Sequence, residues 1–224
     1  MKKKQYIFLL LLLVIFLGGC QMASEKTKKP SEMNPEDLPD VRAFQDEFTR
    51  GFLQSPEETR SGYYPFLSGT GKYKMDFPAG GMIGERAYAR KEKVHEGYPI
   101  HLKNNVVGGA MITIFYFSYD STDELDMNLE SFSARIGKDI NYKKIAGDGQ
   151  SLYYGNIDQN ESHTYAGYIL NEKADGALEV VYQIDCMQEQ KEKCNKNKAK
   201  NEKYVLDWMK SIRFIDENKE VNES

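Results

Sequence analysis

The pattern of apolar and polar residues predicts a first helix near the start of the globular part of the chain. Four apolar residues recur at helical spacing after Asp40, a residue type that caps helices: Val41, Phe44, Phe48 and Phe52. We expect a helix over residues 41–52 whose aromatic stripe packs in the core or, alternatively, recruits a partner. Residues 55–67 contain two prolines and a glycine, so we expect a loop there.

Alternating apolar and polar residues predict strands over much of the remaining chain. In residues 71–77, Tyr73, Met75 and Phe77 alternate with polar residues, and Pro78 ends the ladder because it lacks a backbone donor. The same alternation predicts further strands over residues 85–93, 98–103, 140–146, 151–157, 163–171 and 177–185. Residues 108–119 are apolar on both alternating faces, as in a central strand covered on two sides.

Two further helices follow from capping signals and apolar spacing. Residues 121–124 form a Ser-Thr-Asp-Glu capping box, and apolar residues then recur at helical spacing until Gly137. From Lys196, the residues Val205, Trp208 and Ile212 share one side of a last helix. About three helices and about seven strands with short connections predict an α+β fold with a mostly antiparallel β-sheet.

Two short motifs resemble a known family. The run Tyr73-Lys74-Met75-Asp76-Phe77-Pro78, together with the closing Trp208-Met209-Lys210-Ser211-Ile212-Arg213-Phe214, resembles the PsbP-type extrinsic photosystem proteins and their bacterial relatives over residues 40–215. The resemblance implies an α-β-α sandwich and an accessory, non-catalytic role beside a membrane complex. No functional residue carries over from it.

The first twenty residues have the pattern of an export signal. Three lysines precede the apolar run 7–17, which is about half the ~20 residues that a membrane span needs. The run ends in Leu17-Gly18-Gly19-Cys20 and is similar to the signal of the bacterial lipoprotein family. This resemblance implies cleavage before Cys20, a diacylglyceryl group on its thiol, and a lipid-anchored protein at the extracytoplasmic face of the cell membrane. An ordinary signal peptide followed by an unrelated cysteine is the alternative.

These observations divide the chain into four parts. We expect a signal peptide over residues 1–19, the lipidated Cys20 with a flexible tether to residue 39, a single α+β domain over 40–215, and a disordered tail over 216–224. The tether and the tail are polar and have almost nothing to bury in a core.

Charge argues against a nucleic-acid partner. The net charge of the whole chain is −4, and loss of the three lysines of the signal takes it to −7. A protein that binds nucleic acid is expected to carry an excess of positive charge.

Two cysteines remain after lipidation of Cys20. Because an exported chain meets an oxidising environment, we predict a disulfide between Cys186 and Cys194, which stabilises the fold by roughly 2–3 kcal/mol. Zinc needs more thiols or nearby histidines than this chain offers. The three histidines, His95, His101 and His163, are dispersed in the sequence, so no metal site is expected.

The chain carries no recognisable catalytic motif. Neither Gly-x-Ser-x-Gly nor Ser-x-x-Lys occurs, and the predicted disulfide leaves no cysteine nucleophile. Asp158, Asn160 and Ser162 alternate like calcium ligands, but the glycine and the final glutamate of such a loop are absent. We therefore expect no catalytic residues and no cofactor.

Two functional classes remain. The first is a non-enzymatic lipoprotein that binds or supports a protein partner at the outer face of the membrane, and the alternative is an envelope enzyme whose active site is assembled from distant residues. The oligomeric state stays open.

Two features are candidates for a partner surface. The first is the glycine-rich turn 78–85, in which Met82 and Ile83 place apolar side chains where polar ones are usual. They either contact a partner or fold back to cap the edge of the sheet. The second is a set of tyrosines that either lines a groove for a glycan or peptide or covers a half-wet sheet face: Tyr63, Tyr64, Tyr153, Tyr154, Tyr165 and Tyr168.

Overall fold

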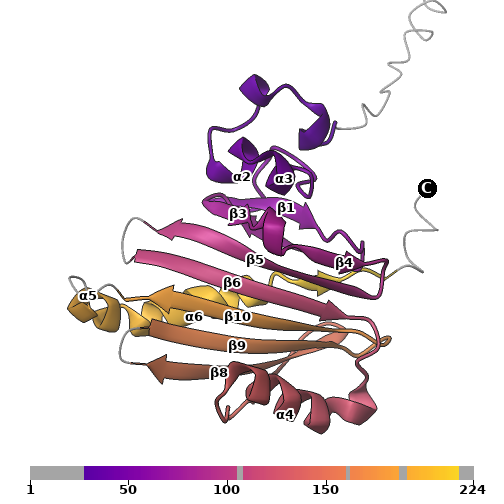
Figure 1. Cartoon of the computed structure of the whole chain (residues 1–224), viewed down its shortest axis with the longest axis vertical. Helices are drawn as coiled ribbons and strands as arrows, with labels where there is room; N and C mark the ends of the chain where they lie inside the picture. Colours follow the sequence, from indigo (N-terminus) through magenta and orange to yellow (C-terminus); the bar gives the residue numbers. More distant parts are fainter. Residues whose placement is uncertain (1–27, 105–107, 160–161, 187–190, 217–224) are drawn as a thin grey trace, which may run out of the picture.

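The computed structural model describes residues 28–104, 108–159, 162–186 and 191–216, which form two antiparallel sheets (Figure 1). The small sheet has the order β1-β2-β11, with β1 Tyr63–Leu67, β2 Tyr73–Pro78 and β11 Arg213–Phe214. The large sheet has the order β3-β5-β6-β10-β9-β8-β7, and β4 also pairs with β5. Its strands are β3 Gly81–Ile83, β4 Ala89–Lys91, β5 His95–Asn104, β6 Gly108–Phe117, β7 Lys143–Ala146, β8 Gln150–Gln159, β9 Ser162–Asn171 and β10 Ala177–Asp185.

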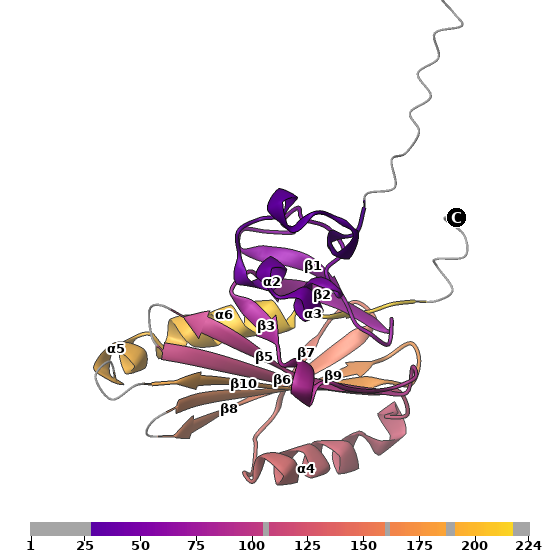
Figure 2. The ribbon, with the colours of Figure 1, turned by 45° about the horizontal axis from the view of Figure 1, so that its top comes forward.

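Helices lie on both faces of the large sheet. The α-helices are α2 Arg42–Gln45, α3 Glu47–Arg50, α4 Leu125–Ile136, α5 Lys191–Lys196 and α6 Lys198–Met209. Short 3-10 turns are η1 Pro30–Glu32, η2 Pro35–Asp37, η3 Glu85–Ala87 and η4 Thr122–Glu124. Figure 2 shows α6 and the small sheet on one side of the large sheet, here called the inner face, and α4 on the opposite outer face. The described helices lack the combination of length and apolar character that a membrane crossing needs.

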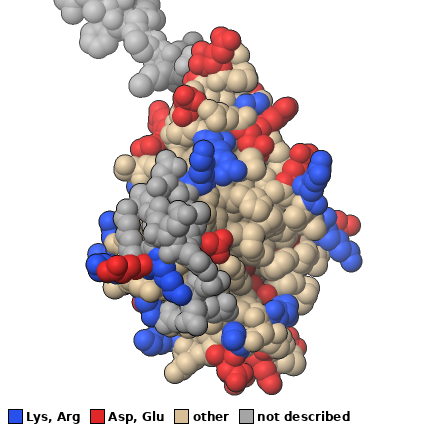
Figure 3. All heavy atoms as spheres, turned by 60° about the vertical axis from the view of Figure 1, so that its left-hand side comes forward, with Lys and Arg blue, Asp and Glu red and all other residues tan. Residues whose placement is uncertain are grey.

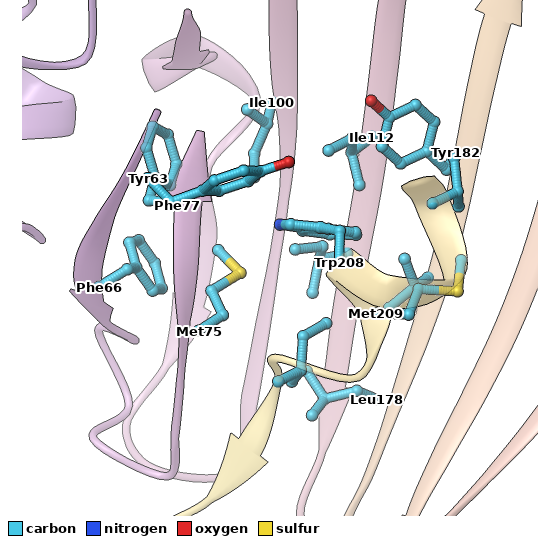
Figure 4. Packing of buried hydrophobic residues seen from close by; sticks show 14 of the residues in the cluster. Tyr63, Phe66, Met75, Phe77, Ile100, Ile112, Leu178, Tyr182, Trp208 and Met209 are labelled. Atoms are coloured by element: carbon cyan, nitrogen blue, oxygen red, sulfur yellow. The ribbon is translucent and has the colours of Figure 1, made fainter. Parts of the chain in front are cut away.

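The main core lies between the inner face, α6 and the small sheet. Trp208 is 1% exposed, and Figure 4 shows its indole between the side chains of the small sheet and those of the large sheet. The indole N–H donates to the backbone oxygen of Asp76 at 2.9 Å, and the ring meets Tyr182 edge-on at 5.7 Å between centroids. Trp208 therefore joins β2 to β10 through one side chain.

A smaller core lies under α4 on the outer face. Phe132 is fully buried there against Ala166, Tyr168 and Leu170 of β9. The helix begins after the predicted capping box and ends at Gly137, whose φ of 73° is the left-handed conformation that favours glycine at a helix end.

The α+β class and the mostly antiparallel sheet are confirmed, but the counts of strands and helices differ from the prediction. The described residues form one sheet of three strands and one of eight, where about seven strands were expected. Residues 63–67 form β1 rather than a loop, and Pro65 is compatible with this because β1 is the edge strand of the small sheet.

The predicted first helix is broken at Asp46. The backbone of Asp46 is extended, with φ −85° and ψ 116°, and its carboxylate accepts a hydrogen bond from the Thr49 N–H at 2.8 Å. The Asp46 side chain therefore caps a second short helix, α3, and the expected continuous helix is divided into α2 and α3. Phe44 is buried, and Phe48 and Phe52 are partly buried against the main core, which favours the core interpretation of the aromatic stripe.

The segment expected as a flexible tether is partly folded. Residues 30–32 and 35–37 form η1 and η2, and Pro30 is buried. The folded part of the chain therefore begins before residue 40. The signal peptide, Cys20 and the tail from residue 217 lie outside the described residues.

We predict that Trp208→Ala lowers the free energy of unfolding by about 3–5 kcal/mol, because it removes a large buried side chain and leaves the Asp76 carbonyl without its donor. Tyr204→Ala is the matched control, since Tyr204 lies on the same helix and is 45% exposed. Urea unfolding followed by circular dichroism measures both variants. Equal losses of stability would contradict a special role for Trp208.

Candidate functional site

The outer face of β5 and β6 carries an exposed apolar surface. We call it the aromatic face and define it by six residues: Val94, His95, Met111, Phe115, Phe117 and Tyr119. Met111 is 39% exposed, Phe115 37% and Tyr119 61%, which are high values for large apolar side chains in or beside a sheet. Figure 1 shows α4 over the β8 side of the sheet, away from β5 and β6.

Strand alternation produces this surface. Ile112, Ile114 and Tyr116 point to the inner face and are buried. Met111, which precedes Ile112, and Phe115, which precedes Tyr116, therefore point outward. The strand was expected to be covered on both sides, and this expectation was wrong because α4 reaches only the other part of the outer face.

The rings of the aromatic face form a cluster around Phe117, in which His95 and Phe115 also lie 6.2 Å apart. His95 lies 5.1 Å from Phe117, Phe115 lies 6.4 Å from Phe117, and Phe117 lies 5.8 Å from Tyr119, all between ring centroids. Gly97 stands opposite Phe115 on β5, and a Cβ atom there would lie only 2.6 Å from the Phe115 ring. The ring therefore rests on the backbone of β5, and no side chain from that position covers it.

The border of the aromatic face is charged. The Arg135 guanidinium of α4 lies 6.0 Å from the Phe117 centroid and forms an ion pair with Glu179 of β10. Figure 3, which brings forward the left-hand side of Figure 1, shows acidic and basic side chains interspersed over that side of the molecule. An apolar centre with a charged border is the arrangement found in protein interfaces.

Two buried carboxylates lie close to this border under α4. Asp120 accepts a hydrogen bond from the Tyr168 hydroxyl at 2.7 Å, and Glu179, which is 2% exposed, accepts from Arg135. Burial raises the pKa of both carboxyls, and their hydrogen-bond partners oppose the rise only in part. Glu179 thus holds α4 to β10, and Asp120 holds the segment between β6 and η4 to β9.

A third buried carboxylate, that of Glu96, is surrounded by donors. It accepts hydrogen bonds from the backbone N–H groups of Gly69 and Thr70, from the Thr70 hydroxyl and from the Tyr88 hydroxyl, at 2.8 to 3.0 Å. Its lone pairs are therefore used to fix the loop before β2 to the large sheet, which is a structural role.

A hollow of about 250 Å³ lies beside β11, at the opposite end of the sheet from the cysteines. Charged residues of both signs line it, including Lys173, Arg213, Asp148 and Asp175. Lys173 and Asp148 approach each other to 3.8 Å. Acids and bases balance in this lining, so it does not favour a ligand of either charge.

The structure contains a disulfide between Cys186 and Cys194, whose Cα atoms are 5.7 Å apart. His163 lies beside it, and its ligand nitrogen and the two sulfurs all lie within 4.8 Å of one another. The histidines are dispersed in the sequence as described, but His163 lies beside the two cysteines rather than beside another histidine. Pairing of β9 with β10 places His163 opposite Ile184, two residues before Cys186, and this register was not visible in the sequence.

The proposed contact residues Met82 and Ile83 lie in β3 rather than in a mobile loop. Ile83 is 1% exposed and its N–H donates to the Thr49 hydroxyl at 2.9 Å, while Met82 is half-buried against Arg42. Gly81 serves close packing, since a Cβ atom there would lie 3.0 Å from both the Phe77 ring and the Pro78 oxygen. The structure favours the alternative that the pair caps the sheet edge, and a contact role for Met82 stays a prediction.

The structure does not support two other sets of candidate residues, the six tyrosines and the residues spaced like calcium ligands. Of the six tyrosines, only Tyr153 is not buried, so they do not line an open groove. Asp158 and Ser162 lie in two paired strands rather than in one calcium loop, and Asn160 lies outside the described residues.

Comparisons with known proteins identify the relatives of the chain. A family model described as "Putative lipoprotein YvcA" matches residues 39–213. The chain is 30% identical to the "Putative lipoprotein YvcA" of Bacillus subtilis (strain 168), over 98% of this chain and 100% of the relative. The PsbP-type resemblance is not shown by these matches.

Two solved structures are similar at lower identity. A mutant of the protein Mog1 has a TM-score of 0.45 at 8% identity, covering 70% of this chain and 97% of the other. The Saccharomyces cerevisiae Ran-binding protein Mog1p has a TM-score of 0.44 at 9% identity, covering 69% and 96%.

The raised pKa values under α4 predict a pH effect on stability. A carboxyl whose pKa is higher in the folded state binds protons better there, so its contribution to stability falls as pH rises from its ordinary pKa, near 4, through the raised value. The double variant Asp120→Asn, Glu179→Gln should therefore gain stability relative to the wild type as pH rises above about 4. Urea unfolding at several pH values measures this gain.

Glu172→Gln provides a control of opposite sign. A hydrogen bond from Ser151 lowers the pKa of this carboxyl, so the wild type should lose stability relative to this variant as pH falls. Parallel curves for the wild type and the double variant would contradict the role given to the buried pair.

Proposed function

The chain belongs to the family described as "Putative lipoprotein YvcA", and from this premise we propose that it is a non-enzymatic lipoprotein anchored through Cys20 at the extracytoplasmic face of the cell membrane, where its aromatic face binds a protein partner. The proposed binding role rests on one observation, the exposed apolar side chains of the aromatic face. The family description and the motif that ends in Cys20 support the anchor.

The position of Cys20 keeps the domain near the membrane. Nine residues lie between Cys20 and Pro30, the first buried residue of the described chain, so ten residue steps join the two. Ten residues span at most about 35 Å when fully extended. A partner of this protein is therefore expected within a few tens of ångströms of the lipid surface.

The chemistry of the aromatic face suits a protein partner. Aromatic residues and methionine are enriched in protein interfaces, and exposed apolar patches on soluble domains mark contact sites. Because Met111, Phe115 and Phe117 sit on paired strands, their backbone is already ordered before binding. An ordered surface loses little conformational entropy on association.

The buried acids support a binding role over an enzymatic one. The carboxylates of Glu96, Asp120 and Glu179 each accept hydrogen bonds from neighbouring groups and are at most 6% exposed. A general acid or base needs access to a substrate. These three groups have a structural role instead.

The anchor predicts a change in partitioning. Cys20→Ser removes the acceptor of the lipid, so the variant should move from the membrane fraction to the soluble fraction or accumulate unprocessed. Mass spectrometry of the wild-type N-terminus measures the lipid directly. A soluble wild-type protein without lipid mass on residue 20 would contradict the anchor but leave the aromatic face untested.

The binding role predicts a position-specific crosslink. A photoreactive p-benzoylphenylalanine in place of Phe115 should crosslink the protein to a partner in intact cells, because this side chain is an exposed member of the aromatic face. The same amino acid in place of Tyr204, which is 45% exposed on α6, is the matched control. Immunoblotting and mass spectrometry identify the products, and equal labelling from both positions would contradict a specific surface.

A further inference from the structure

Three buried side chains from separate elements converge at the far end of β10. His163 comes from β9, Cys186 follows β10, and Cys194 lies in α5. Their exposed fractions are 4%, 5% and 0%, and their ligand atoms all lie within 4.8 Å of one another.

These side chains are a recognised ligand set. Two cysteine thiolates and one imidazole suit Zn²⁺, which takes sulfur at about 2.3 Å and nitrogen at about 2.0–2.1 Å in tetrahedral geometry. Such bond lengths place neighbouring ligand atoms roughly 3.5–3.8 Å apart. The three ligand atoms already lie within 4.8 Å of one another, so after reduction the two sulfurs must move apart and the imidazole must approach by about 1 Å or less.

Burial favours a divalent ion once the disulfide is open. Two buried thiolates without a counter-ion would be costly, whereas two thiolates with Zn²⁺ form a neutral group. Three protein ligands leave a fourth position for water or another small ligand, as in zinc sites that are not purely structural.

The position of the cysteine pair allows it to open without loss of the fold. Cys186 and Cys194 form a hydrophobic cluster of their own, separate from the main core around Trp208 and from the smaller core around Phe132. Breaking their bond therefore leaves both cores in place.

We propose that Cys186, Cys194 and His163 form a redox-controlled zinc site, closed as a disulfide and able to bind one Zn²⁺ after reduction. A dithiol reductant supplies two electrons and two protons to the S–S bond, which gives two thiols and converts the reductant to its own disulfide. Zn²⁺ then binds both sulfurs and releases both protons to water. A small-molecule disulfide reverses the change: it takes two electrons from the two zinc-bound thiolates and two protons from water, becomes two thiols, and the re-formed Cys186–Cys194 bond releases Zn²⁺.

The test uses the exported domain with both cysteines present. Protein reduced with excess dithiothreitol and desalted without oxygen should bind one Zn²⁺ per chain, measured by elemental analysis, and the oxidised protein should bind none. Co²⁺ in place of Zn²⁺ should give thiolate-to-metal charge-transfer absorption, which reports the sulfur ligands independently of stoichiometry.

His163→Ala should weaken Zn²⁺ binding by the reduced protein at least tenfold. Loss of a residue that only hydrogen-bonds a metal ligand already lowers metal affinity about 10–100-fold, and His163 is proposed as a ligand itself. His101→Ala is the matched control, because His101 is exposed on β5 and should leave the affinity unchanged. Far-UV circular dichroism of each reduced sample reports folding.

Three results would overturn the proposal. Reduced, folded protein that binds no Zn²⁺ excludes the site, and reduced protein that has lost its circular dichroism signal excludes a folded open form. Equal affinity in the His163→Ala variant and the wild type excludes the imidazole as a ligand. None of these outcomes depends on the lipid anchor or on the aromatic face.

Discussion

Burial of the inner face of the large sheet is the constraint on which the rest of the structure depends. Trp208 covers part of the inner face, because its ring packs on Tyr182 of β10 and its indole N–H donates to the backbone oxygen of Asp76 in β2. Strand alternation then determines what happens on the other side. Each β6 residue that packs in the main core has a neighbour in sequence that must point to the outer face. On that face α4 covers only the β8 side of the sheet. The aromatic face is thus a direct consequence of the way in which the main core is closed.

The elements with strong local signals could be predicted from the sequence. The helix 125–136 follows a capping-box sequence and ends at a glycine, although neither Ser121 nor Glu124 forms a side-chain cap hydrogen bond, and apolar and polar residues alternate from Tyr73 to Phe77. The predictions failed where the local structure depended on the hydrogen bonds of one side chain or on whether a strand has a neighbouring strand on both sides. Asp46 caps a new turn and breaks the first helix, and Pro65 is tolerated because its strand has a partner on one side only within the small sheet.

The candidate sites could not be predicted, because they depend on strand order and register. Residues 108–119 look the same in sequence whether the outer face is covered or open, and Phe115 is exposed because Gly97 stands opposite it and α4 packs elsewhere. His163 and Cys186 are more than twenty residues apart in the sequence and meet only through the pairing of β9 with β10. Local periodicity carries no information on either arrangement.

β10 contributes both to the border of the aromatic face and to the cysteine site. Glu179 pairs with Phe115 in the register of β10 with β6 and holds α4 through Arg135. Cys186 follows the last residue of β10, beyond the pairing of this strand with β6, which ends at Ile184. The two cysteines also form a buried cluster apart from the core under α4. Under the zinc proposal, the covalent change therefore takes place at the end of β10, away from the pairing that positions Phe115.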